Sequence, residues 1–582
     1  MLTKLTVRNF KRFGNVEIEL GNPVVFIGPN DSGKTTALQA LALWHIGLRR
    51  WNEKRAGKAA PEKRPGVTIN RRDLIAVPVP DANLLWRDLH VRDVRVVKGK
   101  QETQNIRVDI IVEGVNEGKS WACGLEFDYA NEESFYCRPL RRSETKDPDR
   151  MQVPDEASGI RVAFLPPMSG LAASETRLDP GAINVRLGEG RTAEVLRNLC
   201  HQIVTGVDGR QRWGNVCERI KGLFGVSLEE PTYVAERGEI VMAYRSGSAS
   251  GVRLDLSSSG RGLQQTLLLL AHLTVNPESV LLLDEPDAHL EILRQRQIYQ
   301  LLTETAREYG SQIVAASHSE VVLNEAADRD VVVAFVGKPH RIDDRGFQVL
   351  KSLKEIGFED YYQAEEAGWI LYLEGSTDLA ILHTFADTLA HPAATALERP
   401  FVRYVENKPQ RARDHFYGLR EAKRDLVGLA LFDRLDLSLQ DRHEMRERMW
   451  KRREIENYLC TREVLVSWAR DAGGERTGGP LFAQTWVGKM EESIAEIEKA
   501  METLGKGSPW SSDTKVSDDF LDPLFAAFFK KLRLPNLMRK NDYHVLARYL
   551  SMKEIDPEVS EVLDLIAQVA NQARPLRDED AS

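Results

Sequence analysis

The residues Gly28-Pro29-Asn30-Asp31-Ser32-Gly33-Lys34-Thr35 decide the fold of the N-terminal half of the chain. They fit the pattern G-x-x-x-x-G-K-[ST], which is typical of a phosphate-binding loop. The apolar run 23–27 before them predicts a buried strand, and the apolar spacing after them predicts a helix. Glycines let backbone N–H groups converge on phosphate oxygens, and the helix dipole favours their negative charge. The stretch therefore predicts a strand–loop–helix unit that binds a nucleotide.

This loop supplies a set of candidate ATP ligands, namely Gly28, Asn30, Gly33, Lys34, Thr35 and Thr36. Lys34 is expected to reach the β- and γ-phosphates, and the Thr35 hydroxyl is expected to bind Mg²⁺. The alternative is a glycine-rich turn that has only a structural role. The order of strand, loop and helix disfavours that alternative.

A second motif, at the end of another predicted strand, completes the nucleotide site. Four apolar residues, 280–283, precede Asp284 and Glu285. The strand would carry Asp284 to the magnesium ion, and Glu285 would orient and deprotonate the attacking water. His318 follows the next predicted strand at the same edge of the sheet, where it would sense the γ-phosphate. The alternatives are acids that merely close a strand and a histidine with a structural role.

Length and composition limit the class of protein. With 582 residues the chain exceeds one compact core, and about two to four domains are expected. Hydrophobic residues make up 42% and charged residues 29%, which is typical of a folded protein. The 79 basic and 87 acidic residues give a net charge of −8, which excludes a uniformly basic nucleic-acid coat. DNA binding therefore requires local patches.

Cysteine spacing and hydropathy indicate the compartment. The 5 cysteines contain no C-x-x-C pair, which argues against a zinc ribbon and against a disulfide framework. There is no apolar run of about 18 residues and no secretory signal, so no contact with a membrane is expected. These features predict a cytoplasmic protein.

The order of apolar patterns predicts an α/β protein with two parallel sheets. Strands alternate with helices from residue 279 onward and again from residue 369, which is typical of parallel sheets covered on both faces. We expect an ATPase region at 1–340 with a strand-rich insertion at about 49–165, a linker at 341–368, a second α/β region at 369–475, a glycine-rich break at 471–480 and a helical region at 476–582. The basic stretch 49–72 is interpreted as a solvated loop or, alternatively, as a strip that faces DNA.

The motifs of the first region, in this order, resemble the ABC-type ATPase head of SMC-like and recombination-repair proteins. Ser258-Ser259-Gly260, before an apolar helix, lies where that family has its serine–glycine signature. The resemblance implies that Ser258, Ser259 and Gly260 bind the γ-phosphate of ATP held by a second subunit, and that residues 287–290 contact that subunit. It therefore implies a homodimer with heads in head-to-tail orientation, or a higher oligomer. The glutamine loop of the family is expected at 168–175.

Acidic residues also close strands in the second α/β region. Glu374 follows the predicted strand 369–373, and Asp433 and Asp436 follow the predicted strand 426–432. Because the carboxyl ends of adjacent parallel strands converge, Glu374 and Asp433 are expected to share a divalent cation. Clustered carboxylates suit Mg²⁺ or Mn²⁺, and such ions support phosphodiester cleavage. The alternative is a set of solvated acids at strand ends.

This region is similar to the TOPRIM fold, in which a glutamate on the first strand and an Asp-x-Asp pair on a later strand hold metal. The wording E-G-x-x-D at 374–378 and the segment 453–458 resemble the nuclease half of OLD-family proteins and the TOPRIM part of phage-defence systems such as PARIS. The resemblance implies metal binding by Glu374, Asp433 and Asp436, which here are spaced Asp-x-x-Asp, with Mg²⁺, Mn²⁺ or Ca²⁺ as the ion.

Three more residues are candidates for this second site. Glu454 and Glu456 lie two apart, and on a strand both side chains would face one side, where they would add metal ligands. Lys540 resembles the lysine that some family members place near the scissile phosphate. The alternative for Lys540 is a lysine on a helix surface.

Two functional hypotheses remain open. In the first, ATP-bound heads control a metal-dependent TOPRIM DNA endonuclease in bacterial defence against phage. In the second, the ATPase is a sensor or scaffold, and the TOPRIM-like region binds a companion defence protein without cutting DNA. An SMC-like DNA tether is disfavoured, because no heptad array separates the early and late motifs. Basic residues in 403–424 and 446–453 are candidate DNA contacts.

Overall fold

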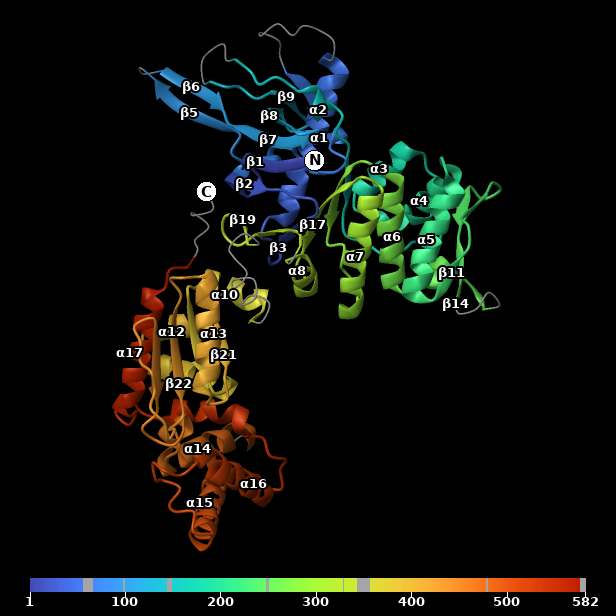
Figure 1. The fold of residues 1–582 in the computed structure, drawn as a ribbon. Helices are drawn as coiled ribbons and strands as arrows, with labels where there is room; N and C mark the ends of the chain where they lie inside the picture. Colours follow the sequence, from blue (N-terminus) through green and yellow to red (C-terminus); the bar gives the residue numbers. More distant parts are fainter. Residues whose placement is uncertain are drawn as a thin grey trace. The chain divides into compact units, whose positions relative to one another are not determined.

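The computed structural model describes residues 1–55, 66–97, 100–143, 149–246, 251–327, 329–342, 356–477 and 480–575. The chain separates into two compact units, Met1–Lys354 and Glu355–Leu576 (Figure 1). Each unit has its own sheets and its own apolar core. Among the described helices, none is both long and apolar enough to cross a lipid bilayer.

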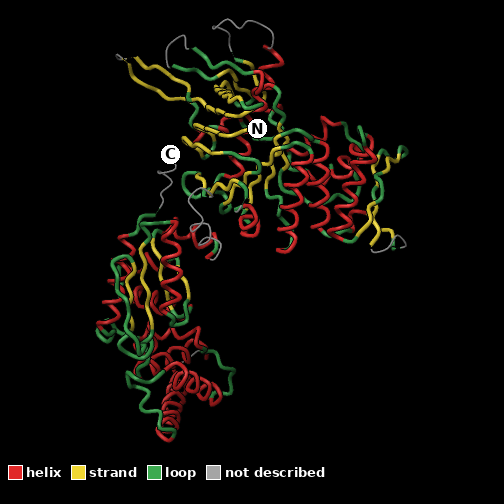
Figure 2. The backbone as a smooth tube through the Cα atoms, viewed as in Figure 1, coloured by secondary structure: helices red, strands yellow, loops and turns green. Residues whose placement is uncertain are grey.

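A largely parallel sheet lies at the centre of the first unit (Figure 2). Its strands follow the order β10 (Val162–Leu165), β16 (Val280–Asp284), β17 (Gln312–Ser317), β3 (Val24–Ile27), β18 (Val331–Ala334) and β19 (His340–Arg341). Only the β18–β19 pair is antiparallel among these strands. Every residue of β3, β16 and β17 is buried, because helices or another sheet cover both faces.

Alternate residues of these strands pack into two different cores. Leu282 belongs to the core on the side of α1 (Lys34–Arg55), whereas Leu281 belongs to the core formed with α6 (Arg261–Val275) and α7 (Ile292–Glu308). This alternation follows from the two-residue period of a strand. It fixes which helices cover each face and leaves the strand ends free to carry polar residues.

An antiparallel sheet packs against the other side of α1. Its strands follow the order β2 (Phe13–Glu19), β1 (Leu2–Phe10), β7 (Arg107–Asn116), β8 (Lys119–Asn131), β9 (Ser134–Pro139) and β4 (Val67–Asn70), beside a hairpin of β5 (Arg92–Val97) and β6 (Lys100–Asn105). Trp44 of α1 stacks on Trp121 of β8 with ring centroids 6.3 Å apart. The insertion at about 49–165 that was predicted to be strand-rich contains β4 to β9 in its described part, after the last turns of α1.

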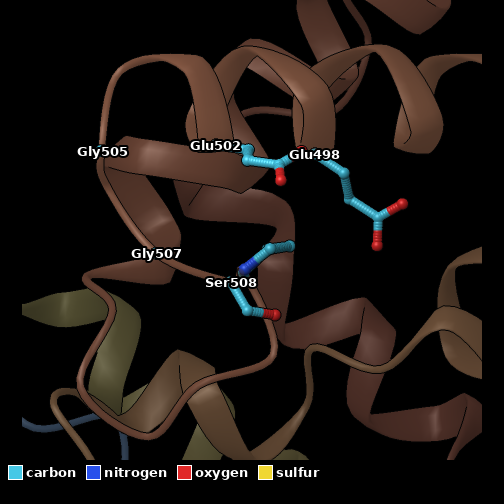
Figure 3. A pocket seen from close by; sticks show the side chains of 6 residues that line it. Glu498, Glu502, Gly505, Gly507 and Ser508 are labelled. Carbon is cyan, nitrogen blue, oxygen red and sulfur yellow. The ribbon is translucent and has the colours of Figure 1, made fainter.

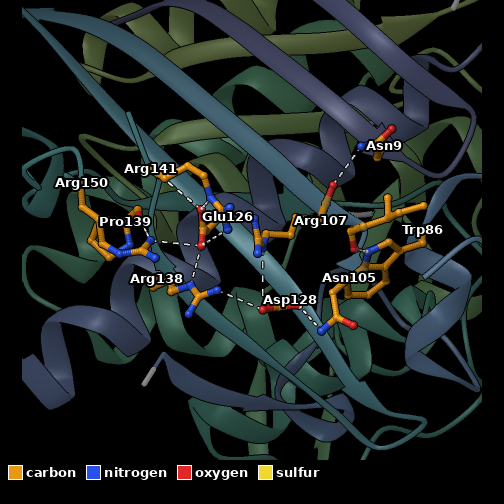
Figure 4. Close-up of polar contacts among 11 residues, drawn as sticks. Asn9, Trp86, Asn105, Arg107, Glu126, Asp128, Arg138, Pro139, Arg141 and Arg150 are labelled. Atoms are coloured by element: carbon orange, nitrogen blue, oxygen red, sulfur yellow. Dashed lines mark hydrogen bonds and ion pairs between the residues drawn. The ribbon is translucent and has the colours of Figure 1, made fainter. Parts of the chain in front are cut away.

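A buried glutamate organises the polar side of this sheet (Figure 4). The Glu126 carboxylate is 0% exposed and forms ion pairs with Arg138, Arg141 and Arg150. Burial of an unpaired carboxylate is costly, so three guanidinium partners account for its position inside the fold. Asp128 contributes a second carboxylate, which also pairs with Arg138.

A helical lobe completes the first unit beside the parallel sheet. Its helices are α3 (Pro180–Gly188), α4 (Leu196–Thr205) and α5 (Gly209–Phe224), which precede small strands β11 (Val226–Leu228), β12 (Thr232–Val234), β13 (Glu239–Val241), β14 (Ala243–Ser246) and β15 (Arg253–Asp255). The helices α4 and α5 pack against α6 and share its apolar core. Short connectors α2 (Asp155–Ser158) and α8 (Glu320–Ala326) complete the α-helices described in this unit.

The second unit is built on a four-stranded parallel sheet. Its strands follow the order β21 (Val402–Tyr404), β20 (Trp369–Leu373), β22 (Val427–Phe432) and β23 (Met445–Met449). Its helices are α10 (Phe358–Ala367), α11 (Ser376–Thr388), α12 (Ala393–Glu398), α13 (Pro409–Ala422), α14 (Arg462–Thr477), α15 (Pro480–Thr503), α16 (Asp522–Lys531) and α17 (Pro557–Gln572). The strand β23 and the helix α12 were absent from the sequence prediction.

Polar contacts fasten α10 to the sheet of the second unit. Tyr372 of β20 is fully buried and shares a hydrogen bond of 2.8 Å with Nδ1 of His415. The other ring nitrogen of His415 lies 3.1 Å from the Asp360 carboxylate of α10. The predicted linker 341–368 is therefore too long, because the helix at its end belongs to the second unit.

Two other local predictions were wrong for physical reasons. Residues 49–55, predicted as part of an exposed loop, are the last turns of α1, while residues 56–65 lie outside the described residues. The glycine-rich stretch 471–480 does not break the chain at its start, because α14 continues to Thr477. A Cβ atom on Gly473 would lie 2.8 Å from Trp486 of α15. Glycine there permits the close approach of two helices.

This contact predicts opposite effects for two neighbouring glycines. We expect Gly473→Ala to lower the free energy of unfolding by about 1–3 kcal/mol, because the added methyl group overpacks the contact with Trp486. A Cβ atom on Gly474 would meet no atom within 4 Å. Gly474→Ala is therefore expected to raise the free energy of unfolding by about 1 kcal/mol, because alanine has the higher helix propensity. Urea unfolding followed by tryptophan fluorescence measures both. Equal effects of the two substitutions would contradict the packing.

Candidate functional site

The phosphate-binding loop encloses a cavity at the carboxyl end of β3. The cavity has a volume of about 290 Å³ and is lined by Asn30, Asp31, Ser32, Gly33, Lys34, Thr35, Thr36 and Glu285. The Lys34 ammonium group donates hydrogen bonds to the carbonyl oxygens of Gly28 (2.7 Å) and Pro29 (2.6 Å). Burial lowers the pKa of Lys34, and the carboxylates of Glu285 and Asp284 oppose that shift.

Glycine is required at two positions of this loop. Gly33 has φ = +103°, a left-handed conformation that side chains with a Cβ atom rarely adopt. A Cβ atom on Gly28 would lie 2.9 Å from the carbonyl oxygen of Phe335 and 2.9 Å from Oγ of Ser32. Both glycines therefore let the backbone turn tightly around the space that phosphates would fill.

Thr35 and Asp284 meet across the sheet although they are far apart in sequence. The Thr35 hydroxyl lies 3.1 Å and 2.9 Å from the two carboxylate oxygens of Asp284, which is 6% exposed. Burial raises the pKa of Asp284 to about 6, and the hydrogen bond from Thr35 opposes this shift. A hydroxyl and a carboxylate beside a phosphate cradle are ligands that Mg²⁺ uses with nucleotides. The pair therefore fits the Mg²⁺ of Mg-ATP.

Glu285 and His318 lie at the same edge of the sheet. Glu285 follows β16 with φ = +49°, and its backbone N–H donates to the carbonyl oxygen of Ala316. This left-handed residue turns the chain, and its carboxylate lines the cavity. The Nδ1 atom of His318 lies 3.5 Å from Oε1 of Glu285. The two side chains therefore lie together at this edge, although only Glu285 is among the residues that line the cavity.

The predicted signature residues lie outside the lining of this cavity. The hydroxyl of Ser258 donates to the carbonyl oxygen of Asp255 (2.6 Å), and that of Ser259 donates to the carbonyl oxygen of Leu256 (2.7 Å). Ser258 and Gly260 are exposed, and α6 begins directly after Gly260. The turn presents its polar groups to solvent rather than to the phosphate loop of its own chain.

A buried arginine joins this turn to the stretch in which the glutamine loop was expected. Arg197 is 1% exposed and donates to the Asp255 carboxylate (3.0 Å) and to the carbonyl oxygen of Ala172 (2.9 Å). The Glu175 carboxylate accepts hydrogen bonds from the backbone N–H groups of Arg197 and Asn198. The segment 168–175 is thus fixed to the helical lobe. It supplies none of the residues that line the nucleotide cavity.

Glu374 and Asp433 come together in the second unit. They follow β20 and β22, which are neighbouring parallel strands. One amide group bridges them, because Nδ2 of Asn407 donates to Oε2 of Glu374 (2.8 Å) and to Oδ2 of Asp433 (3.1 Å). The backbone N–H of Asp433 donates to Oδ1 of the same Asn407 (2.9 Å). The two carboxylates therefore share one small, partly buried site.

Burial and, after it, the crowding of carboxylates raise several pKa values around this pair. Burial, followed by the contact with Glu374, raises the pKa of Asp433 to about 9. Burial and then the charge of Glu454 raise the pKa of Glu456 to about 8. Burial and then the charge of Glu374 raise the pKa of Asp378 to about 6. A divalent cation would relieve this repulsion.

The donor set fits a cation that keeps much of its water. Among the described residues, no three histidine, cysteine, aspartate or glutamate side chains form a group arranged to hold a metal. Mg²⁺ is commonly bound through one or two carboxylates with several waters retained. The pair Glu374 and Asp433 satisfies that smaller requirement.

The predicted strand geometry of Glu454 and Glu456 was wrong. Residues Ile455–Tyr458 form a 3-10 turn, so the two side chains do not follow strand spacing. The Glu454 carboxylate accepts hydrogen bonds from the backbone N–H (2.5 Å) and hydroxyl (3.0 Å) of Ser517. Its position is explained by this structural contact. Glu456 is 3% exposed and adds its charge to the acidic cluster.

Asp436 lies apart from the predicted acidic site, whereas Lys540 lies close to residues that surround it. Asp436 is exposed on the loop after β22 and, among the described residues, makes no hydrogen bond with Glu374 or Asp433. The Lys540 ammonium group lies 3.3 Å from Oγ of Ser517 and 3.7 Å from the Asp518 carboxylate. Burial alone would lower the pKa of Lys540, but the charges of Glu456 and Asp518 outweigh it and raise that pKa.

Sequence reasoning missed two residues of this site. Asn407 lies shortly after β21, and nothing local in the sequence marks its amide as a bridge between two distant acids. Lys515 pairs with Asp518 at 2.6 Å, and Glu374 is among the carboxylates that raise its pKa after that pairing. A second lysine therefore stands near the acids. The only sequence feature that pointed to Lys515 was its position in the helical region, between the acidic strands and Lys540.

A larger cavity elsewhere in the second unit is a poor phosphate site (Figure 3). It has a volume of about 540 Å³ and is lined by Glu498, Glu502, Gly505, Gly507, Ser508 and Pro509. Two glutamates and no basic side chain stand in this described lining. Such a surface would repel a phosphate group.

Comparisons with known proteins match segments that contain the nucleotide motifs. Residues 1–45 match the family model of an AAA ATPase domain, and residues 245–324 match that of an AAA domain described as a putative AbiEii toxin of a type IV toxin–antitoxin system. The oligopeptide transport ATP-binding protein AppD of Bacillus subtilis (strain 168) is 31% identical over 77 residues, which is 13% of this chain. The chain spans only 23% of the length of that relative.

Solved SMC heads are also similar in structure. The SMC head domain from Thermotoga maritima has 15% identity and a TM-score of 0.31, with 59% of this chain and 98% of that chain covered. The Pyrococcus furiosus Smc head with an extended coiled coil, bound to the C-terminal domain of ScpA, has 14% identity and a TM-score of 0.33, with 61% and 99% covered.

The matched segments carry Lys34 in one case and Ser258 to Glu285 in the other. The first unit therefore carries the nucleotide motifs of an ATPase. The sheet order, the phosphate loop and the Thr35–Asp284 contact all agree with that assignment. ATP is therefore the nucleotide of this domain.

Two substitutions in the ATPase domain separate nucleotide binding from hydrolysis. Lys34→Ala is expected to abolish ATP binding, because it removes the ammonium group that would leave the loop carbonyls for phosphate. Glu285→Gln is expected to keep ATP binding but to slow hydrolysis by about 100-fold or more, because it removes the general base. Binding of a fluorescent ATP analogue and phosphate release measure the two steps. Lys338→Ala, which changes an exposed lysine, is the matched control and is expected to bind ATP normally. Full ATP binding by Lys34→Ala would contradict the assignment.

Proposed function

We propose that the chain is an ATP-binding and ATP-hydrolysing protein with a metal-dependent DNA endonuclease domain, which acts in bacterial defence against phage. In this proposal the second unit is a TOPRIM-like nuclease domain controlled by the ATPase domain. The observation that carries it is the convergence of Glu374 and Asp433 at the carboxyl ends of adjacent parallel strands, joined by Asn407. This arrangement agrees with a hard divalent cation at the edge of the sheet.

The residues around this pair suit a phosphodiester substrate. Mg²⁺ or Mn²⁺ bound there would polarise a phosphoryl oxygen and promote ionisation of water. Lys540 and Lys515 supply positive charge beside the acids, and both contact Asp518. They would neutralise backbone phosphates and hold the scissile bond at the acidic centre. Cleavage of a polyanion needs both groups, because the acids hold the metal ion and the basic side chains bind the phosphates.

The basic clusters predicted as DNA contacts are largely neutralised within the fold. Arg413 pairs with the buried Glu447, and Lys423 pairs with Glu365 of α10. In the second cluster, Arg446, Arg448, Lys451 and Arg452 also form ion pairs with acids. These pairs support structural roles for most of the two clusters. The proposed DNA contact is therefore centred on the exposed Arg453 and on Lys515 and Lys540, two lysines that share the one acid Asp518.

Cleavage assays test the nuclease directly. Plasmid cleavage in Mg²⁺ or Mn²⁺ is expected to fall about 100-fold or more in Glu374→Gln and in Asp433→Asn, because each removes a charged metal ligand. Asp387→Asn, at an exposed acid near the end of α11, is the matched control and is expected to cut normally. Because Asp436 is exposed apart from the pair, Asp436→Asn is expected to lose less activity than Glu374→Gln.

A sensor or scaffold without nuclease activity is the second candidate function. It is favoured by the exposure of Asp436 and by the absence, among the described residues, of a group of three metal-binding side chains. In that case the TOPRIM-like unit would bind a companion defence protein. Intact plasmid under every metal and nucleotide condition, with clean wild-type protein, would favour the scaffold over the nuclease.

The proposal includes a head-to-tail homodimer formed with ATP. The signature turn is exposed and lies outside the cavity of its own chain, which agrees with a contact to ATP on a second subunit. Glu285→Gln with ATP is expected to double the mass seen by light scattering, and Ser258→Arg in the same background is expected to keep it monomeric. Unchanged dimerisation with Ser258→Arg would contradict the role of the turn, and the same protein with ADP serves as control.

A further inference from the structure

Asn407 lies where three strand ends meet in the second unit. It follows β21, and its side chain reaches Glu374 after β20 and Asp433 after β22. Its backbone is left-handed, with φ = +54°, and the preceding Glu406 is also left-handed, with φ = +51°. Asparagine tolerates this conformation better than most residues with a Cβ atom. The backbone geometry thus aims this side chain across the edge of the sheet.

The hydrogen bonds settle which way the amide faces. The backbone N–H of Asp433 can only donate, so the atom of Asn407 that it contacts at 2.9 Å is the carbonyl oxygen Oδ1. The NH₂ group then points at the two carboxylates and has two hydrogens, one for each acid. All polar atoms of the amide are used, which leaves its side chain little freedom to turn.

The amide contacts one oxygen of each acid, and the two carboxylates also contact each other. The amide occupies Oε2 of Glu374 and Oδ2 of Asp433. The Asp378 carboxylate accepts a hydrogen bond of 3.1 Å from the backbone N–H of Glu374, which holds that strand end in place. The shared donor of Asn407 holds the two acids close together.

We propose that Asn407 is the positioning residue of the divalent-cation site. It orients Glu374 and Asp433 so that both carboxylates can bind one ion. The inference rests on the proposed metal-dependent function, and it adds a residue whose role is carried by geometry rather than by charge. Partners that orient metal-binding carboxylates typically contribute about 10–100-fold to metal affinity.

Mn²⁺ titration of the full chain tests this role. Asn407→Gly removes the amide and keeps a residue that accepts the left-handed backbone, and Glu406→Gly makes the same change at the exposed neighbouring position. Binding is measured by electron paramagnetic resonance of free Mn²⁺ without nucleotide, and the Glu374→Gln titration is subtracted. Asn407→Gly is expected to bind Mn²⁺ about 10–100-fold more weakly than the wild type, and Glu406→Gly is expected to match the wild type.

A second measurement separates positioning from a general loss of structure. The Mn²⁺ concentration for half-maximal plasmid cleavage is expected to rise in Asn407→Gly, while the rate at saturating Mn²⁺ returns to near the wild-type value. A structural defect would instead lower the maximal rate and the melting temperature. A reduced maximal rate with unchanged Mn²⁺ affinity would overturn the inference.

The remaining outcomes distinguish this inference from the proposed function. Equal Mn²⁺ affinity in Asn407→Gly and Glu406→Gly, or tighter binding in Asn407→Gly, would overturn the positioning role while the nuclease assignment stands. Wild-type protein without any Glu374-dependent Mn²⁺ binding would overturn the metal site itself and the inference with it.

Discussion

Both units depend on holding carboxylates, buried in the first unit and partly buried in the second, at the carboxyl ends of parallel strands. A parallel sheet buries its strands on both faces, so its functional groups gather at one edge. Burial there is costly for an acid unless a donor or a cation satisfies it. Asp284 meets the hydroxyl of Thr35, and the pair Glu374 and Asp433 shares the amide of Asn407. Each site is held by hydrogen bonds, and a divalent cation would neutralise the negative charge that the acids bring together.

The two units use this constraint for different chemistry. In the ATPase domain the acid lies beside a loop whose glycines and lysine are shaped for phosphates. In the second unit the acids crowd together, and lysines come from the helical region that follows the sheet. The first arrangement suits a small, tightly enclosed nucleotide. The second suits a phosphodiester that approaches an acidic centre from a basic side, which is the basis of the nuclease proposal.

Local sequence patterns predicted the strands and loops that carry motifs, and missed what depends on distant partners. The short apolar runs before Asp284 and Asp433 predicted buried strands, because such runs are typical of strands that are covered on both faces. Asn407 escaped notice, since its role depends on two acids from other strands. The basic stretches suggested DNA contacts, but acids from elsewhere neutralise most of them. The glycines near Gly473 suggested a break, but Trp486 requires a small residue inside a helix.

The most direct test of the account is anomalous X-ray scattering from crystals of the full chain that contain Mn²⁺. The account predicts a strong peak within bonding distance of carboxylate oxygens from both Glu374 and Asp433, with Asn407 still in contact with the same two side chains. An ordered structure in which these carboxylates point apart, or lie together with no peak between them at saturating Mn²⁺, would contradict it.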